Sequence, residues 1–365
     1  MTAILGFSNR HASILTSDLL ISSKKIDTDR ILHLPSMNSL KQRVPDNFEL
    51  IAKDLVQKLY VVGNFMFCWA GTKIYAKAYL NEVRTEFAKS RSLSLKKLRS
   101  IFESDPDYTT HLAIIGIIRG DSSSHLVTFG ENLSKHHRTD LGKIAFGGSG
   151  TKNLAKFINN IPGTEKADPM QYLSYAFTAS GFLQQQESIT GATLSDYYGG
   201  GYEIGSSLKG KFGKNAEATY IFWEITCTDR KITTTYLMPH VLKYFYFRDI
   251  LVILRFRFNA PGLEFQPISD GETSGIFLIP ELQSPPLTGL PENFSLPSLN
   301  SSPMCNVIRI HYGNKGTKVA PIIQFNYDDV YFQEIDQTLT LHANSKFLNY
   351  LRDLIVNHPW ANNGS

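Results

Sequence analysis

The chain has 365 residues, of which 42% are hydrophobic and 19% are charged, a balance that can fill one large core or two ordinary ones. The net charge of +4 is small and no dense basic tract occurs, so we expect no nucleic-acid partner. The three cysteines, Cys68, Cys227 and Cys305, are widely spaced without a CxxC motif, which argues against zinc or a disulfide framework and favours a cytoplasmic location. No signal-peptide pattern and no apolar run of roughly 18 residues occurs, so we expect no membrane partner.

The N-terminal residues are predicted to form a hairpin. Two short apolar runs, 2–8 and 12–18, are separated by Asn9-Arg10-His11, which is typical of two strands and a turn. The following stretch, about 22–56, is polar, contains Pro35 and Pro45, and has no continuous period. We therefore expect it to be an insertion at the rim of a site and the first place that limited proteolysis cuts.

A strand pair and a helix are predicted after this insertion. The segment KLYVVGNFMFCWAG, which begins at Lys58, contains two apolar runs separated by the turn dipeptide Gly63-Asn64. From 72 to 87, large side chains recur every four positions, which predicts a helix with one buried face. Residues 111–130 form a second hairpin around RGDSSS, which we interpret as a turn and not as an adhesion motif.

The next region contains strands and helices that do not alternate regularly. A strand at 143–149 ends in glycines and precedes a helix, and a longer helix is predicted over 169–185. A glycine-rich turn at 199–201 then leads into further strands. The order of hairpins and helices is not a βαβ alternation, so it predicts an α+β fold of antiparallel sheets with helices outside them.

The last third of the chain is predicted to be rich in strands. Residues 244–258 (YFYFRDILVILRFRF) are interpreted as a strand pair interrupted by charged residues. The Pro- and Ser-rich stretch 279–303 is expected to be an extended crossing segment, and 344–356 a final helix. We expect one domain over 2–226 and a β-rich C-terminal extension over 227–365 that packs on it.

Conspicuous residues begin or end the predicted elements of the first domain. The first strand begins at Thr2, and its hairpin partner ends at Asp18. Lys58 precedes a strand pair that runs into Ala70-Gly71 and a helix. In these features the chain resembles the proteasome β-subunits and the bacterial HslV peptidase, N-terminal-nucleophile hydrolases that start at a catalytic threonine. The resemblance implies a four-layer αββα sandwich of two antiparallel sheets over residues 2–226.

Two glycine-rich motifs extend this resemblance. Gly147-Gly148-Ser149-Gly150 is similar to the Gly-Ser-Gly turn that opens a helix in the family. Residues 196–201 are similar to the family's Asp-x-x-Ser-Gly-Gly segment, with Gly199 in place of the serine. The chain departs from the family in its long insertion, in lacking the arginine that often follows the first aspartate, and in its C-terminal extension.

The residues also support this chemistry by themselves. A threonine hydroxyl is a weak nucleophile and needs a base within hydrogen-bond reach. A free α-amine has a pKa of about 7.7–8.0, so Thr2 would carry its own base once Met1 is removed. Lys58 would supply positive charge that lowers the pKa of nearby groups, and Asp18 would pair with Lys58.

Three further residues are expected to complete the site. The Gly71 N–H, at the mouth of a helix, would stabilise an oxyanion, an interaction worth about 3–4 kcal/mol. Ser149 and Asp196 would orient the Thr2 amine as supporting groups. We expect Thr2, Lys58 and Asp18 to converge, with Asp196 approaching from the opposite side.

Each of these residues also has an ordinary structural interpretation. Asp18 and Asp196 can be turn formers, Lys58 can be solvated, Gly71 can simply be a terminus before a helix, and the GGSG motif can be only a turn. If Lys58 is not the site lysine, the next candidates are Lys24, Lys25 and Lys53.

Other motifs point less clearly to chemistry. Residues 135–138 (KHHR) contain adjacent histidines, but flanking cations oppose a metal, so we interpret them as a solvated loop. The GGSG motif lacks the Lys-Ser/Thr of a phosphate-binding P-loop. We therefore expect neither a metal nor a cofactor.

Two functions from different classes remain open from the sequence. The first is an N-terminal-threonine hydrolase that cleaves amide bonds, with peptides as the substrates that the family suggests. The alternative is a non-catalytic, proteasome-like scaffold or interaction module. In either case the C-terminal extension is a candidate surface for a partner protein or for another copy of the chain. A retained Met1 would favour the alternative, since it abolishes the amine base.

Overall fold

The computed structural model describes residues 2–24, 34–36, 50–121, 123–160, 168–190, 192–208, 211–227, 239–258, 271–284, 289–300, 303–325, 328–335 and 338–357. The chain divides into two compact units, one of Met1–Asn215 with Ile279–Leu287 and one of Ala216–Leu278 with Thr288–Ser365. The boundary lies before the expected position at 226/227. The reason is that β13 (Glu217–Thr226) pairs with strands of the second unit.

The first unit contains a six-stranded antiparallel sheet with the order β12-β11-β2-β1-β10-β9. Its strands are β1 (Ala3–Ser8), β2 (Ala12–Asp18), β9 (Leu133–Arg138), β10 (Gly142–Gly148), β11 (Tyr202–Leu208) and β12 (Lys211–Lys214). The predicted N-terminal hairpin is confirmed, and Asn9 closes its turn by accepting hydrogen bonds from the N–H groups of His11 and Ala12. The KHHR motif was wrongly predicted to be a loop, because it belongs to edge strand β9, where its first three side chains are exposed.

A second, four-stranded antiparallel sheet has the order β5-β6-β7-β8. Its strands are β5 (Leu59–Val62), β6 (Phe65–Gly71), β7 (Leu112–Arg119) and β8 (Ser124–Phe129). Both hairpins were predicted, including the turn after Arg119. Buried side chains of the two sheets share one core, to which β1 contributes Ile4, β6 contributes Met66 and β7 contributes Ile115. The two sheets of the first unit therefore pack against each other.

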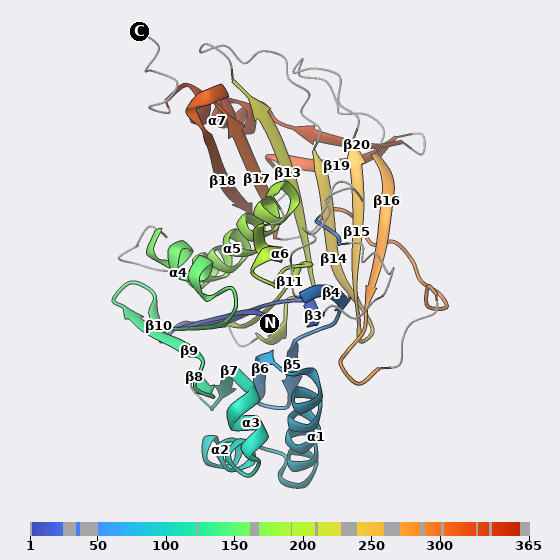
Figure 1. The fold of residues 1–365 in the computed structure, drawn as a ribbon. Helices are drawn as coiled ribbons and strands as arrows, with labels where there is room; N and C mark the ends of the chain where they lie inside the picture. Colours follow the sequence, from blue (N-terminus) through green and yellow to red (C-terminus); the bar gives the residue numbers. More distant parts are fainter. Residues whose placement is uncertain are drawn as a thin grey trace. The chain divides into compact units, whose positions relative to one another are not determined.

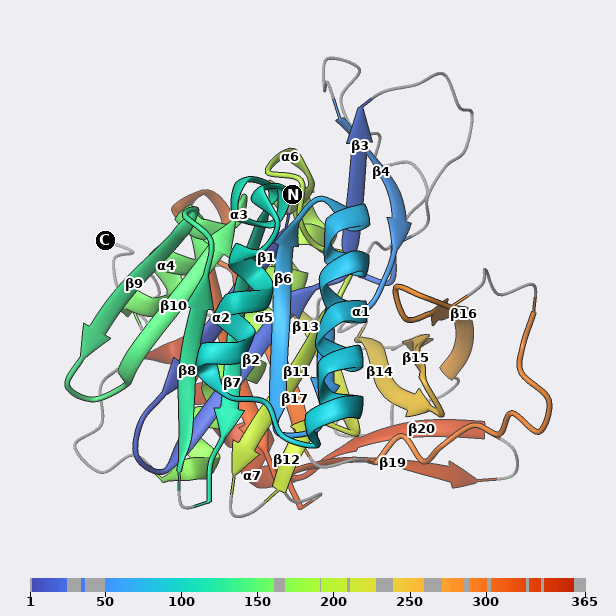
Figure 2. The same cartoon turned by 90° about the horizontal axis from the view of Figure 1, so that it is seen from below.

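Helices cover the outer faces of these two sheets. One group packs on β5–β8, and the other contacts β1, β2, β10 and β11 (Figures 1 and 2). The first group is α1 (Lys73–Ser90), α2 (Leu95–Glu103) and α3 (Pro106–His111); the second is α4 (Thr151–Asn160), α5 (Pro169–Thr190) and α6 (Ala192–Ser195). The sequence did not predict α2 and α3, although Ser94 and Asp105 cap their first turns. The first unit is thus α+β, with antiparallel sheets inside and helices outside.

The predicted insertion at 22–56 is not simply a loop. Its first and last residues contribute to the paired strands β3 (Leu20–Lys24) and β4 (Leu50–Leu55). Between them the structure describes 34–36, where Leu34 and Ser36 are buried. The rest of the stretch, including Pro45, lies outside the described residues, so its predicted protease sensitivity stays a prediction.

The second unit is a six-stranded mixed sheet with the order β16-β15-β14-β13-β17-β18. Beside β13 it contains β14 (His240–Phe247), β15 (Ile250–Phe258), β16 (Gly271–Ile279), β17 (Met304–His311) and β18 (Thr317–Gln324). One core joins it to the hairpin of β19 (Val330–Ile335) and β20 (Thr338–Ala343) and to α7 (Ser345–Val356). The predicted strand pair at 244–258 is β14 and β15, and the predicted last helix is α7.

The segment after β16 holds part of the first unit in place. Its described residues, 280–284 and 289–300, contain no helix or strand, in agreement with the prediction for 279–303. The N–H of Gln57 donates to the Pro280 carbonyl at 3.2 Å, and the N–H of Leu282 donates to the Tyr60 hydroxyl at 2.9 Å. A late part of the chain therefore fixes the residue that immediately precedes Lys58.

Candidate active site

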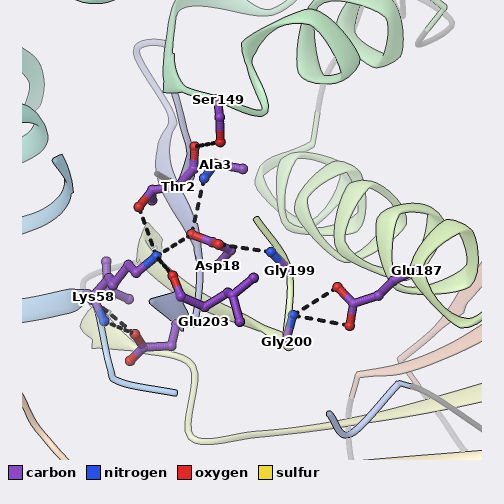
Figure 3. A network of polar contacts seen from close by, with 11 residues as sticks. Thr2, Ala3, Asp18, Lys58, Ser149, Glu187, Gly199, Gly200 and Glu203 are labelled. Atoms are coloured by element: carbon purple, nitrogen blue, oxygen red, sulfur yellow. Dashed lines mark hydrogen bonds and ion pairs between the residues drawn. The ribbon is translucent and has the colours of Figure 1, made fainter. Parts of the chain in front are cut away.

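Three of the predicted site residues converge in the first unit (Figure 3). The Lys58 ammonium lies 2.9 Å from the Thr2 hydroxyl oxygen and 2.8 Å from Oδ1 of Asp18. It also donates to the Leu20 carbonyl at 2.5 Å. An ammonium has three N–H donors and no acceptor, so these three oxygens account for all of its donors. Thr2, Asp18 and Lys58 therefore form one connected polar group.

The surrounding protein excludes water from this group. Thr2 is 1% exposed, and Asp18 and Lys58 are each 0% exposed. Burial lowers the pKa of Lys58, and the negative charge of Asp18 opposes this shift. Burial likewise raises the pKa of Asp18, opposed by Lys58 and by backbone N–H donors. Buried charges are costly unless they are paired and hydrogen-bonded, which both of these are.

Backbone contacts orient the Asp18 carboxylate. Its Oδ1 accepts from the Ala3 N–H at 3.1 Å, and its Oδ2 accepts from the Gly199 N–H at 2.9 Å. Gly199, Gly200 and Gly201 all have positive φ angles, of 132°, 74° and 108°. Such angles favour glycine, so the glycine run is needed for the turn that presents this N–H to Asp18.

A second carboxylate, which the sequence did not reveal, holds the backbone at Lys58. Glu203 of β11 is 2% exposed and accepts from the N–H groups of Lys58 at 2.6 Å and of Leu59 at 3.0 Å. Lys214 forms an ion pair with it at 3.0 Å. The one sequence signal for a buried Glu203 was its position between the apolar residues Tyr202 and Ile204. In the structure all three side chains are buried. Glu203 therefore fixes the start of β5, from which Lys58 extends.

A cleft of about 1020 Å³ begins beside this polar group. Its lining includes Gly71, Gly148 and Ser149, together with charged side chains at its edge such as Asp54 and Lys73. Gly71 has a φ of 121°, and a Cβ at this position would lie 1.9 Å from the His111 carbonyl oxygen. Because no side chain fits there, the end of β6 stays open to the cleft.

The two remaining predicted residues, Ser149 and Asp196, differ in their contacts. The Ser149 hydroxyl donates to the Thr2 carbonyl at 3.5 Å, a long hydrogen bond. Asp196 is exposed, and its Oδ2 accepts from Nδ2 of Asn153 at 3.1 Å. The same Asn153 nitrogen donates to the Tyr198 hydroxyl at 2.7 Å. The structure thus gives Asp196 a partner that the sequence did not predict.

The structure also bears on the choice of lysine. Lys58 is the lysine that contacts Thr2 among the residues whose side chains are described. Lys25 lies outside the described residues, and so do the side chains of Lys24 and Lys53.

Comparisons with known proteins leave the family open. No protein-family model matches the chain, and no curated protein matches it at the significance required. Among the described residues, no group of three or more His, Cys, Asp or Glu side chains could hold a metal ion. None of the described helices is both long enough and apolar enough to cross a membrane.

Proposed function

We propose that this chain is a threonine-type N-terminal-nucleophile hydrolase that cleaves amide bonds through an acyl-enzyme on Thr2. The observation that carries the proposal is the contact of 2.9 Å between the Lys58 ammonium and the Thr2 hydroxyl, buttressed by buried Asp18. A nucleophile beside a buried cation, itself held by a carboxylate, is a typical arrangement for lowering the pKa of a hydroxyl.

The donor arrangement assigns the proton-transfer roles. A charged Lys58 has no lone pair, and it donates to the Thr2 hydroxyl, which must accept this bond. The hydroxyl proton therefore points away from Lys58, and during the reaction it must be transferred to a group other than Lys58. The Thr2 α-amine, once free, is the base that lies on the same residue, and its ordinary pKa suits neutral pH.

The reaction follows from these roles. The Thr2 oxygen attacks the amide carbonyl carbon, and its proton passes to the α-amine. The oxyanion forms toward the N–H of Gly71 at the cleft, and the α-ammonium protonates the leaving amine as the C–N bond breaks. Water then attacks the ester on Thr2 and gives a proton to the α-amine, which returns it to the threonine oxygen as the C–O bond of the ester breaks and the acid leaves. Lys58 remains charged throughout and stabilises the developing negative charge on the threonine oxygen.

The arrangement of sheets and helices supports the same proposal. Two antiparallel sheets that share a core and carry helices outside are compatible with the four-layer αββα sandwich of the proteasome-like hydrolases. The glycine turn differs in detail, since Gly199 supplies a backbone N–H to Asp18 where the family has a serine.

Access to Thr2 makes removal of Met1 part of the proposal. The Thr2 side chain and backbone are 1% exposed in the full chain, whereas the cleft reaches its neighbours Gly148 and Ser149. Cleavage of the Met1–Thr2 bond would create the amine base on the residue that lies beside this cleft. The cleft lining mixes apolar side chains, such as Ile21, Leu112 and Leu133, with charged side chains of both signs, which is compatible with a peptide that carries both kinds of side chain.

Labelling with an epoxyketone tests the proposal, because this electrophile needs both the hydroxyl and the amine of an N-terminal threonine. The protein is produced behind a cleavable fusion partner that leaves Thr2 first, and intact mass verifies the terminus. We expect one label on wild type, a slower reaction for Thr2→Ser, and none for Thr2→Ala. Equal labelling of wild type and Thr2→Ala would exclude the enzymatic function.

The burial of Thr2 also gives the alternative function specific support. If Met1 is retained in cells, Thr2 stays enclosed and lacks its base, and the chain acts as a non-catalytic scaffold. Intact-mass spectrometry of the protein purified from its own cells distinguishes the two. A terminus at Thr2 supports the hydrolase, and a terminus at or before Met1 supports the scaffold.

A further inference from the structure

Glu187 is a buried acid that the proposed reaction does not use. It lies three residues before the end of α5 and is 0% exposed. Its carboxylate accepts from the Gly200 N–H at 2.9 and 3.1 Å, from the Thr193 hydroxyl at 3.0 Å, and from the Ser36 hydroxyl. Four hydrogen bonds to one side chain therefore join three separate segments of the chain.

This position is unfavourable for a carboxylate. The C-terminal turn of a helix disfavours negative charge, and in the described part of the chain no Lys, Arg or His forms an ion pair with Glu187. Burial raises its pKa to about 7, with a smaller contribution from the charge of Asp18. Burial of the charge and the helix C-terminus both disfavour an acid at this position, so we look for its role in the groups that it binds.

The first of these groups is the glycine turn at 199–201. Gly199 approaches Glu187 so closely that a Cβ on it would lie 1.6 Å from Oε2. Gly200 donates its N–H to both oxygens of the carboxylate. The turn therefore lies directly on Glu187.

The glycine turn also holds two of the groups that accept hydrogen bonds from Lys58. The Gly199 N–H donates to Asp18, and the Gly199 carbonyl accepts from the Leu20 N–H at 3.0 Å. Asp18 and the Leu20 carbonyl are two of the three acceptors of the Lys58 ammonium. A shift of the turn would therefore move both acceptors and change how Lys58 meets Thr2.

The second group held by Glu187 is the insertion. Ser36 is 0% exposed and Leu34 is 3% exposed. A Cβ on Gly200 would lie 3.6 Å from Leu34, so this side chain also reaches the glycine turn. Residues 34–36 are thus anchored to the same turn that orients Asp18.

We propose that Glu187 is a positioning residue that clamps segment 34–36 of the insertion to the glycine turn and thereby sets the geometry of Asp18, Lys58 and Thr2. The proposal rests on the proposed function for its effect on the reaction, but not for the clamp itself. Glu187 touches no reacting atom and acts through Gly200 and Gly199.

The clamp should respond to pH near neutrality. The carboxylate form accepts all four hydrogen bonds, whereas a protonated carboxyl must place a donor where one of these acceptors was. The titratable groups that face it across the turn are Asp18 and the neutral Tyr198. The bonds from Ser36, Gly200 and Thr193 lower the pKa of the enclosed carboxyl, so protonation favours a state in which these bonds break while Glu187 stays buried. Lowering the pH through about 7 should therefore loosen the turn and segment 34–36 together.

Hydrogen exchange of the full chain tests the clamp without relying on activity. Glu187→Gln keeps the shape and imitates the protonated form, and Ser36→Ala removes the contact to the insertion only. Ser180→Ala is the matched control, because Ser180 is equally buried on α5 and donates to its own helix at Ala176. At pH 8 we expect exchange around 34–36 and 198–202 to rise about tenfold or more in Glu187→Gln. At pH 6 the difference from wild type should largely disappear, and Ser180→Ala should match wild type.

Epoxyketone labelling provides the second readout. The labelling rate of Glu187→Gln should fall about tenfold or more at pH 8 and lose a titration step near pH 7 that wild type shows. Unchanged exchange at the turn in Glu187→Gln, or, if that variant does not fold, unchanged exchange at 34–36 in Ser36→Ala, would overturn the clamp. Wild type that exchanges as expected but takes no label would refute the proposed hydrolase and leave the clamp established.

Discussion

Two lysines with fully buried side chains, one in each unit, differ in what surrounds them. Lys58 pairs at 2.8 Å with Asp18, which is 0% exposed, whereas Lys243 pairs at 2.7 Å with Glu217, which is 41% exposed. Burial lowers the pKa of both lysines. The comparison teaches that burial of a lysine, or a lowered pKa, does not identify a reactive site.

The partners explain the difference. Lys243 lies opposite Thr219 on β13, so Glu217 is its diagonal neighbour on the adjacent strand and reaches water. Such a pair is an ordinary way to satisfy a lysine within a sheet. Lys58 instead donates to a hydroxyl, a carboxylate and a carbonyl that are all enclosed. The hydroxyl among its acceptors distinguishes Lys58 from Lys243 and is the basis of the role proposed for it.

The largest expected effect concerns labelling of Thr2 by an epoxyketone. Lys58→Met should reduce the rate by about 10³-fold, since it removes the charge and donor at the nucleophile. Lys243→Met should leave the rate within about threefold of wild type, because surface-connected pairs contribute little. Circular dichroism of both variants controls for folding. Equal loss in the two variants would mean that labelling reports stability and not the site.

The same pair of variants should separate in stability. Lys58→Met leaves Asp18 buried without its cation and should lower the free energy of unfolding by about 3–5 kcal/mol. Lys243→Met leaves a carboxylate that water can solvate and should cost less than about 1 kcal/mol through the lost pair. Urea denaturation measures both. The double variant Asp18→Asn/Lys58→Met should regain part of the loss yet remain unlabelled, and a double variant as unstable as Lys58→Met would contradict this account.

Glu187 should add a pH dependence that neither lysine provides. Its pKa is about 7 in the folded protein and about 4.5 in the unfolded chain, so between these values the folded state binds more protons. The free energy of global unfolding therefore falls as pH rises through this window, by about 3 kcal/mol relative to Glu187→Gln, because the unfolded chain exposes the carboxylate to water. The local loosening of the turn at low pH is a separate effect, since Glu187 stays buried there. Urea denaturation of both proteins between pH 4.5 and 8 measures the difference. Parallel stability curves would show that Glu187 does not titrate there.

The sequence predicted the parts of the site that local patterns encode. Thr2, Asp18 and Lys58 each stand where an apolar run begins or ends, and these strand boundaries, taken together with the order of the motifs, placed them. Gly71 and the glycine turn were placed by the order of motifs along the chain, and the structure gives them positive φ angles, which favour glycine.

The parts that depend on distant contacts were not predictable in this way. Glu187 and Glu203 lie within a helix and a strand, and their roles arise from partners far away in the sequence. Ser36 was assigned to a polar insertion, because one buried hydroxyl leaves no periodic pattern. The boundary at Asn215 also differs from the expected one at 226/227, since β13 pairs with β14 and with β17, which lies far along the chain.

The smallest expected effect lies on the exposed side of the candidate site. Asp196 is exposed, and solvent screens its charge, whereas Asp18 is enclosed. Asp196→Asn should therefore slow labelling by no more than about tenfold, and Asp18→Asn by far more. If Asp196 acts through its hydrogen bond from Asn153, then Asn153→Ala should reproduce the effect of Asp196→Asn, and the two changes together should add little. If Asp196→Asn lowers the labelling rate as much as Asp18→Asn does, Asp196 belongs among the groups that touch the reacting atoms. The exposed and enclosed sides of the site would then have equal importance.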